Sequence, residues 1–305
     1  MSLIVFAFAI TFAHAQLSNA PTPEWKVTLK IVDDNGKPVA DAKTVVGYGT
    51  NHITGLTDTN GIFFASHRDK SYSLGFLVTK DGYYLTRQTY DLGWAYQYNE
   101  AKWNPTETIV LRKIGNPISM YAKRQEMKFP KLDEPVAFDL MTGDWVTPYG
   151  KGEHVDMFFT AHRKIINNRE FNAQLTVTFP NKGDGIAVAS SESAVGSEFK
   201  TSRTATKSGY EPTLVLDFSN SKRPDSVFGY FIRVRTELDQ DSNVKSALYG
   251  KIAGNFRFYA GTIAPTSGMG FDYYLNPTPN DSNVEFDPKK NLVRDLKPLE
   301  GVSGP

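Results

Sequence analysis

Alternation of apolar and polar residues limits this chain to β-structure more strongly than any other feature of its sequence. From Trp25 to Ile31, apolar residues alternate with single polar ones, a spacing that puts the apolar side chains on one face of a strand. The run ends in Asp-Asp-Asn-Gly-Lys-Pro at 33–38, which is typical of a hairpin turn. We therefore predict a strand followed by a type I′ turn, and a second turn of this type at 58–61.

Similar short runs, separated by turn residues, recur along the rest of the chain. The expected strands are 39–46, 62–64, 72–78 and 108–112 in the first part, and 136–140, 155–162, 173–179, 214–218, 229–236, 247–252 and 269–275 in the second. Strands spaced about 8–12 residues apart are typical of β-sandwiches, and a chain of 305 residues suits two domains. The sequence thus predicts an all-β fold with two β-sandwich domains, of which the second is either a sandwich or a jelly roll.

Four motifs in the first part occur in a characteristic order: a strand, then D-x-x-G-K-P-V-x-x-A, then T-D-x-x-G-x-F, then a strand ending in K-D-G-Y. The residues that carry them are Asp33, Gly36, Lys37, Pro38, Val39, Ala42, Thr57, Asp58, Gly61, Phe63, Gly82 and Tyr83. Residues 22–113 thereby resemble the carboxypeptidase regulatory-like domain, a transthyretin-like β-sandwich. The resemblance implies an accessory module of exported proteins. The His/Arg site and C-terminal tetrapeptide of the related hydroxyisourate hydrolases are not found here.

The N-terminal residues have the pattern of an export signal. An apolar run from Leu3 to Phe12 precedes Ala13-His14-Ala15, which fits a signal peptide over 1–15 with a small-x-small cleavage site. No Lys or Arg precedes the run, which we explain by a start further upstream. We expect an exported protein, periplasmic or extracellular, with no transmembrane segment, since no other stretch is apolar enough to cross a bilayer.

The remaining segments complete the expected domain layout. Residues 114–135 contain several prolines and basic side chains and are predicted to be a linker, either solvated or docked on an anionic surface. Residues 136–275 form the second domain, and 276–305 an extended surface tail. The D-W-x-x-P-Y-G-K-G segment at 144–152 and Y-Y-L-N-P at 273–277 resemble segments of uncharacterised exported bacterial proteins. That resemblance implies no activity.

Composition and motifs exclude several classes of function. The chain has no cysteine, which removes disulfides, thiolate catalysis and cysteine metal sites. Its net charge of +1, without a basic helix, argues against nucleic acid as a partner. The sequence also lacks H-E-x-x-H, a G-x-S-x-G elbow and a phosphate-binding loop. No catalytic residue can be named.

Two sets of residues are candidate metal ligands. His154 and Asp156 would share one face of a strand, but a catalytic metal needs about three protein ligands. A distant carboxylate such as Asp139 or Asp144 could complete the set; the interpretation we favour is a hydrogen-bonded histidine. The oxygens of Asp239, Asp241 and Asn243 have the spacing of positions 1, 3 and 5 of a calcium loop, but the glycine and acid of that loop are missing. We favour a polar hairpin tip there. No cofactor is expected, and Ca²⁺ is kept as the alternative.

Aromatic residues offer the best candidate ligand surface. Trp94, Tyr96 and Tyr98 alternate along the chain, so on a strand their rings would line one face that could stack on sugars. The interpretation we favour is that these rings pack between the two domains. Trp103 follows them. A second candidate surface is the 144–152 loop with Trp145, Pro148, Tyr149 and Lys151, where Asp144 and Trp145 could equally form a structural corner.

We therefore predict an exported non-enzymatic binding or structural protein, and carbohydrate is the ligand we favour. One alternative is a hydrolase of polysaccharides with its site in the second domain. The other is a role in envelope assembly. The expected partner is accordingly a glycan or another envelope protein.

Overall fold

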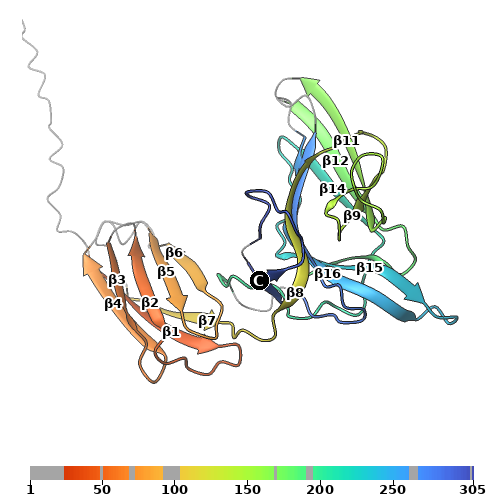
Figure 1. Cartoon of the computed structure of the whole chain (residues 1–305). Coiled ribbons are helices and arrows are strands. Elements are labelled where there is room, and N and C mark those ends of the chain that lie inside the picture. The colour runs from red at the N-terminus through yellow and green to blue at the C-terminus, as the bar shows by residue number, and fades with distance from the viewer. Residues whose placement is uncertain are drawn as a thin grey trace, which may run out of the picture.

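The computed structural model describes residues 24–48, 51–68, 73–91, 104–167, 170–189, 195–260, 267–302 and 304–305. Every regular element within these ranges is a β-strand, and the strands form four sheets. Figure 1 shows them gathered into two groups. The predicted all-β fold with two β-sandwich domains is confirmed.

The expected signal peptide, 1–15, lies outside the described residues. Within the described ranges, no helix has the length and apolar character needed to cross a membrane.

Seven strands build the first domain: β1 (Glu24–Asp33), β2 (Lys43–Tyr48), β3 (Asn51–Leu56), β4 (Ile62–Arg68), β5 (Ser73–Thr79), β6 (Thr86–Asp91) and β7 (Thr106–Leu111). One sheet has the order β4-β1-β7 and the other β3-β2-β5-β6. Alternate residues of β1 and β5 are buried and meet in one core, among them Trp25, Leu29 and Phe76. The alternation that predicts the first strand is thus the one that fills this core.

Three tight loops share one geometry, and they begin at Asp33, Asp58 and Asp239. In each, the aspartate Oδ1 accepts backbone N–H groups two and four residues later, at 2.8–2.9 Å. The third residue on has a φ of 64–74°; it is Gly36, Gly61 or Ser242. A type I′ turn needs two residues with positive φ, so these loops are type I turns followed by one left-handed residue. The predicted type I′ geometry is wrong.

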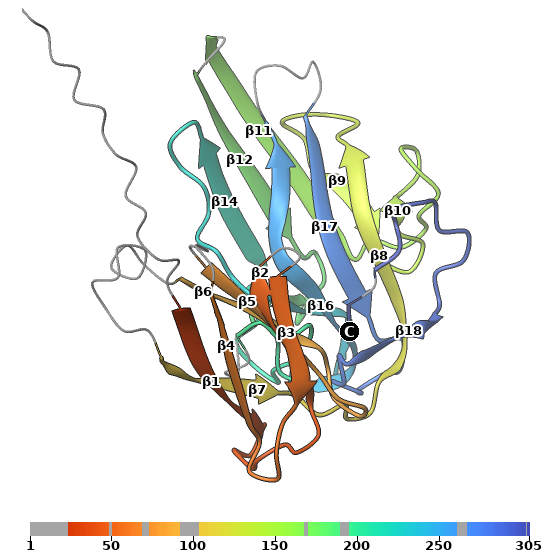
Figure 2. The same ribbon diagram turned by 90° about the vertical axis from the view of Figure 1, so that its left-hand side faces the viewer.

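Eleven strands build the second domain: β8 (Ile118–Lys128), β9 (Val136–Asp139), β10 (Asp144–Trp145), β11 (Met157–Asn167), β12 (Glu170–Thr178), β13 (Gly185–Val188), β14 (Thr213–Ser219), β15 (Gly229–Leu238), β16 (Val244–Tyr259), β17 (Gly268–Leu275) and β18 (Phe286–Asn291). One sheet has the order β10-β9-β11-β12-β14 and the other β13-β15-β16-β17-β8-β18. Figure 2 shows the long strands of both sheets above the first domain.

The six-stranded sheet is buried on both faces. Its inner face packs against the five-stranded sheet, where Phe138, Phe159 and Phe271 stack at ring distances of 5.5–6.0 Å. Its outer face carries a second core around Phe231 and Tyr274. Apolar residues of two segments, 195–210 and 284–302, belong to that core, among them Ala205 and Val284. Both segments are therefore part of the folded domain.

The segment predicted to be a linker holds a strand of this sheet. Residues 118–128 form β8, which pairs with β17 along eight residues from Tyr121 to Lys128. Two of its basic residues are paired with acids distant in sequence, since Arg124 lies 2.9 Å from Asp272 and Lys123 lies 3.5 Å from Glu300. The linker prediction is wrong for residues 118–128.

The expected surface tail is also packed into the domain. Phe286 is fully buried in β18, which pairs with β8. Val284 and Val302 lie in the outer core. The carbonyl oxygen of Pro305 accepts a hydrogen bond from the buried Lys251, at 3.0 Å. The prediction of an extended tail fails because these apolar residues, although few, are buried.

The two domains meet at Phe199. Arg112, from the end of the first domain, donates to the carbonyl oxygens of Phe199 at 2.9 Å and Thr201 at 2.6 Å. The Arg112 guanidinium also lies 4.6 Å from the centre of the Phe199 ring. A second link is the hydrogen bond of 2.6 Å from the Tyr84 hydroxyl to the buried carboxylate of Glu285. Charge-assisted hydrogen bonds of this kind are among the stronger ones in proteins.

A buried lysine also lies against the Phe199 ring. The Lys251 ammonium is 4.7 Å from the centre of the Phe199 ring and 4.8 Å from that of Tyr274. Burial lowers the pKa of Lys251 to about 7, although the carboxylate of Glu285 opposes the shift. The folded protein therefore holds this lysine partly neutral at physiological pH.

Stability should rise with pH between about 7 and 9 because of Lys251. In that range the unfolded lysine still binds its proton while the folded one has lost it, so the unfolded state binds more protons and is disfavoured as pH rises. The slope from this residue is at most about 1.4 kcal/mol per pH unit. Urea unfolding at pH 7, 8 and 9 measures it, and Lys251→Met should remove it.

Lys245→Met on the same strand is the matched control, because the Lys245 side chain is 70% exposed. That variant should keep the pH slope of the unaltered protein. An identical slope in Lys251→Met and the unaltered protein would show that Lys251 is not the titrating group.

Candidate functional site

Asp139 organises the loop that follows β9. The residue is only 1% exposed. Its Oδ1 accepts the N–H groups of Met141 and Thr142, and its Oδ2 accepts those of Glu153 and His154, at 2.9–3.2 Å. Burial opposes ionisation, but these hydrogen bonds outweigh it and hold the pKa of Asp139 below its ordinary value. The Asp139 carboxylate thus holds both ends of the loop together, up to His154 fifteen positions later.

Arg235 supplies the positive charge for this buried region. It lies at a bulge in β15 with a φ of 55°, a left-handed conformation that costs energy for a residue with a side chain. Asp184 holds the bulge by accepting the N–H groups of Arg235 and Thr236. The bulge directs the guanidinium to Asp156 at 2.8 Å and to Asp139 at 3.2 Å.

The predicted pair of His154 and Asp156 does not form a metal site. Both precede β11, and their side chains diverge: Asp156 is fully buried and paired with Arg235, whereas the His154 side chain is 64% exposed. Among the described residues, no group of three or more His, Asp or Glu side chains could hold a metal ion. The prediction that the two share one strand face is wrong.

Asp239, Asp241 and Asn243 form the tip of the β15–β16 hairpin. The Asp239 carboxylate accepts the backbone N–H groups of Asp241 and Asn243 and also the Asn243 side-chain amide. These bonds are the turn geometry described above for Asp33 and Asp58. The polar hairpin tip accounts for the calcium-like spacing.

The structure places the aromatic candidate residues in different surroundings. Trp94, Tyr96, Tyr98 and Trp103 lie outside the described residues. Trp145 is 5% exposed and packs on Phe129, Phe138 and Phe159, so the prediction that it binds ligand at the surface is wrong. Tyr149 is 40% exposed, and the Lys131 ammonium lies 6.0 Å from the centre of its ring.

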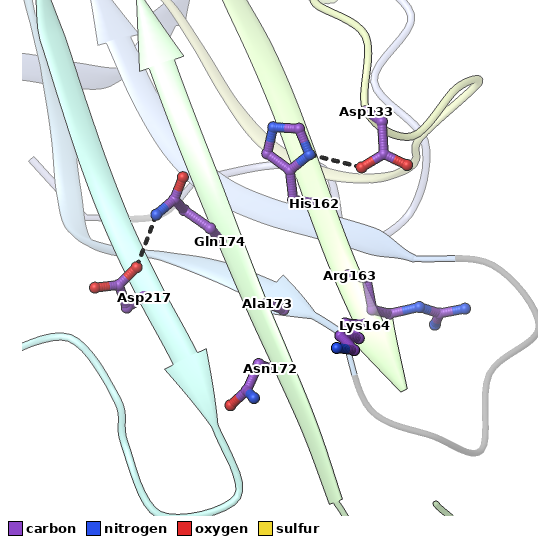
Figure 3. Close-up of a pocket in the computed structure, with 8 residues that line it drawn as sticks. All are labelled: Asp133, His162, Arg163, Lys164, Asn172, Ala173, Gln174 and Asp217. Carbon is purple, nitrogen blue, oxygen red and sulfur yellow. Dashed lines mark hydrogen bonds and ion pairs between the residues drawn. The ribbon is translucent and has the colours of Figure 1, made fainter. Parts of the chain in front are cut away.

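An open cavity of about 410 Å³ lies on the outer face of the five-stranded sheet, and Figure 3 shows its lining. The lining residues are polar apart from one alanine: Asp133, His162, Arg163, Lys164, Asn172, Ala173, Gln174 and Asp217. Two contacts between these side chains fix their positions. The His162 Nδ1 lies 2.6 Å from Asp133 Oδ1, and the Gln174 amide donates to Asp217 Oδ1 at 3.0 Å.

Strand register aligns three of these side chains in one row. His162 on β11 pairs with Gln174 on β12, which pairs in turn with Asp217 on β14. Neighbouring strands lie about 4.8 Å apart, so the row presents hydrogen-bonding groups over roughly 10 Å. Hydrogen bonds from Gln174 and Lys222 hold the pKa of Asp217 below its ordinary value. The row therefore offers an amide, an imidazole and an ionised carboxylate on rigid strands.

Sequence reasoning does not find this row, because it depends on the pairing of strands up to 55 positions apart, from His162 to Asp217. The alternation of β11 and β12 does place His162 and Gln174 on exposed faces. Only the register shows that they are neighbours.

No family model matches the chain, and a search of the curated proteins finds no match either. Solved structures similar to parts of it include 3-chlorocatechol 1,2-dioxygenase of Rhodococcus opacus 1CP, at 16% identity over 30% of this chain and 61% of that one, with a TM-score of 0.25. BcpA, the major pilin subunit of Bacillus cereus, is 11% identical over 86% of this chain and 99% of that one, TM-score 0.25. A candidate carbohydrate-binding protein of Bacteroides uniformis ATCC 8492 is 11% identical over 81% and 96%, TM-score 0.22.

These similarities assign neither a family nor a function, because every TM-score is 0.25 or lower. The chain spans less than two thirds of the dioxygenase. The carboxypeptidase regulatory-like domain stays a prediction.

The Asp139–Arg235–Asp156 cluster should behave as a structural ion pair. Arg235→Met should lower the free energy of unfolding by about 3–5 kcal/mol, since it leaves two buried carboxylates without their cation. His154→Ala should change it by less than about 0.5 kcal/mol, because that side chain is exposed. Urea unfolding measures both.

If the Asp139–Arg235–Asp156 cluster is a structural ion pair without a bound metal, EDTA should leave the melting temperature unchanged. A drop in that temperature upon adding EDTA, restored by Ca²⁺, would instead indicate a metal site.

Proposed function

We propose that this is an exported, non-enzymatic glycan-binding protein whose ligand lies across β11, β12 and β14. The observation that supports it is the row His162–Gln174–Asp217 on the floor of an open cavity. Sugar hydroxyl groups both donate and accept hydrogen bonds, and amide, carboxylate and imidazole groups match them. Because these side chains stand on paired strands and are held by neighbours, little conformational entropy is lost on binding.

Shape also supports a chain-like ligand. The cavity is open to solvent and follows the face of a sheet, so a polymer could enter and leave at both ends. The outer face continues in Thr160, Thr176 and Val215, which are aligned in the next row of the same three strands. A second row of this kind would extend the contact to a neighbouring sugar.

The first domain would then be an accessory module that holds the second in place. The contacts of Arg112 with Phe199 and Thr201 fix it against the second domain. Attachment of the protein to another envelope component through the first domain remains compatible with glycan binding by the second.

Binding should depend on the row of polar residues. A glycan array selects neutral oligosaccharides, and calorimetric titration then measures affinity for the unaltered protein and for Gln174→Ala and Asp217→Ala. Each variant should bind about 10-fold to 100-fold more weakly, which corresponds to the loss of a hydrogen bond to a charged or amide group.

Glu237→Ala is the control, since that exposed side chain lies on β15 of the other sheet. Unchanged affinity in both Gln174→Ala and Asp217→Ala would rule out this surface. Release of new reducing ends during incubation with the bound glycan would instead support the hydrolase alternative.

A further inference from the structure

A second cavity, of about 460 Å³, lies between the 144–152 loop and the C-terminal part of the chain. It is lined by residues of three segments: 123–127 in β8, 142–151 in the loop, and 293–300 near the end of the chain. We call it the loop groove. It contains no residue of the cavity over β11, β12 and β14, so it is a separate place on the same domain.

Most residues of the D-W-x-x-P-Y-G-K-G segment have a structural role in shaping this groove. The two Asp144 oxygens accept the N–H groups of Trp145 at 2.8 Å and Lys151 at 3.0 Å, which closes the loop. Trp145 anchors it in the core. A side chain on Gly150 would lie 2.7 Å from Asp144 Cγ, and one on Gly152 would lie 2.8 Å from Asp139 Cβ, so both positions require glycine.

The loop thereby fixes the backbone of Lys151 while leaving its side chain in solvent. The Lys151 side chain is exposed and has no ion-pair partner within 4.0 Å among the described residues. Arg294, on the C-terminal segment, is likewise exposed and without such a partner in the described part of the chain. Lys297, three residues beyond Arg294, is a third exposed cation of the lining without such a partner in the described part of the chain, so unpaired cations from two distant segments line one groove.

Two of the four acids of the groove are paired with a cation. Glu300 lies 3.5 Å from the Lys123 ammonium and accepts the Lys297 N–H at 3.0 Å. Glu126 is paired with Arg257 at 2.9 Å. Asp144 and Asp295 have no ion-pair partner among the described residues. Three cations of the lining, Lys151, Arg294 and Lys297, also lack such a partner, so unpaired positive charge exceeds unpaired negative charge by one.

We propose that the loop groove binds the carboxylate of an acidic sugar, with Lys151 and Arg294 as its two cationic contacts. The proposal deepens the proposed glycan-binding function and rests on it for the class of ligand. A guanidinium matches a carboxylate by two parallel hydrogen bonds, and an ammonium adds a point charge. Thr142 and Asp144 line the same groove and offer oxygens to the sugar hydroxyls.

The test uses trigalacturonate and its fully methyl-esterified form, which share a backbone and differ only in charge. Calorimetric titration should show binding of the acid form at least 10-fold tighter than that of the ester. The double variant Lys151→Gln/Arg294→Gln should lose this preference. Raising NaCl from 0.05 to 0.5 M should weaken binding of the acid form alone, since exposed charges are screened by salt.

The matched control is Lys245→Gln, an exposed lysine on the β15–β16 hairpin, which should keep the preference for the acid form. Equal affinity for the acid and its ester, or an unaltered preference in the double variant, would overturn the proposal. Sulfated dextran that binds with the same dependence on Lys151 and Arg294, where trigalacturonate does not bind, would overturn the carboxylate and identify a sulfate site.

The two sites can fail independently. Loss of neutral-glycan binding in Gln174→Ala, with the acid preference intact, supports both proposals. If neutral glycans do not bind at all but trigalacturonate binds through Lys151 and Arg294, the cavity over β11, β12 and β14 is excluded and the loop groove is supported.

Discussion

The buried carboxylate of Asp139 is the constraint on which much of the second domain depends. A carboxylate removed from water is costly unless hydrogen bonds and opposite charge replace the solvent. The loop from 140 to 154 supplies the hydrogen bonds, and Arg235 supplies the charge. Because Arg235 reaches this point only from a bulge, the bulge and its support by Asp184 belong to the same requirement. The shape of the loop, and the presentation of Lys151 and Tyr149 on it, follow from an interaction inside the protein.

Sequence patterns predict the strands well where one face of a sheet is exposed to solvent. The alternation in β1, β12 and β14 is explicit, and these strands occur where the pattern places them. The pattern fails for β8, which carries basic residues that look suited to a linker. Arg124 and Lys123 fit in the sheet because they form ion pairs with Asp272 and Glu300, which are distant in sequence. The pattern also fails for the C-terminal part, because its few apolar residues are separated by many polar residues and prolines and show no alternation.

The candidate sites were harder to predict for a related reason. Residue type alone favours Trp145 as a ligand platform, yet a tryptophan ring is as suited to a core, and this one fills a core of Phe residues. His154 and Asp156 are neighbours in sequence with opposite surroundings. The row His162–Gln174–Asp217 and the pair Lys151 and Arg294 each join segments whose proximity depends on tertiary structure. Local spacing contains no information about either.

The tight loops at Asp33 and Asp58 have a consequence for the slow chemical damage of the protein. Both contain Asn-Gly, the dipeptide that rearranges most readily to isoaspartate when the glycine nitrogen attacks the preceding side chain. Here the N–H groups of Gly36 and Gly61 are bonded to the carbonyl oxygens of Asp33 and Asp58, at 2.9 and 3.0 Å. A glycine nitrogen held by this hydrogen bond is not free to attack the asparagine side chain, as it would be in a flexible loop of the same sequence. The geometry that ends these strands therefore also slows their spontaneous chemical damage.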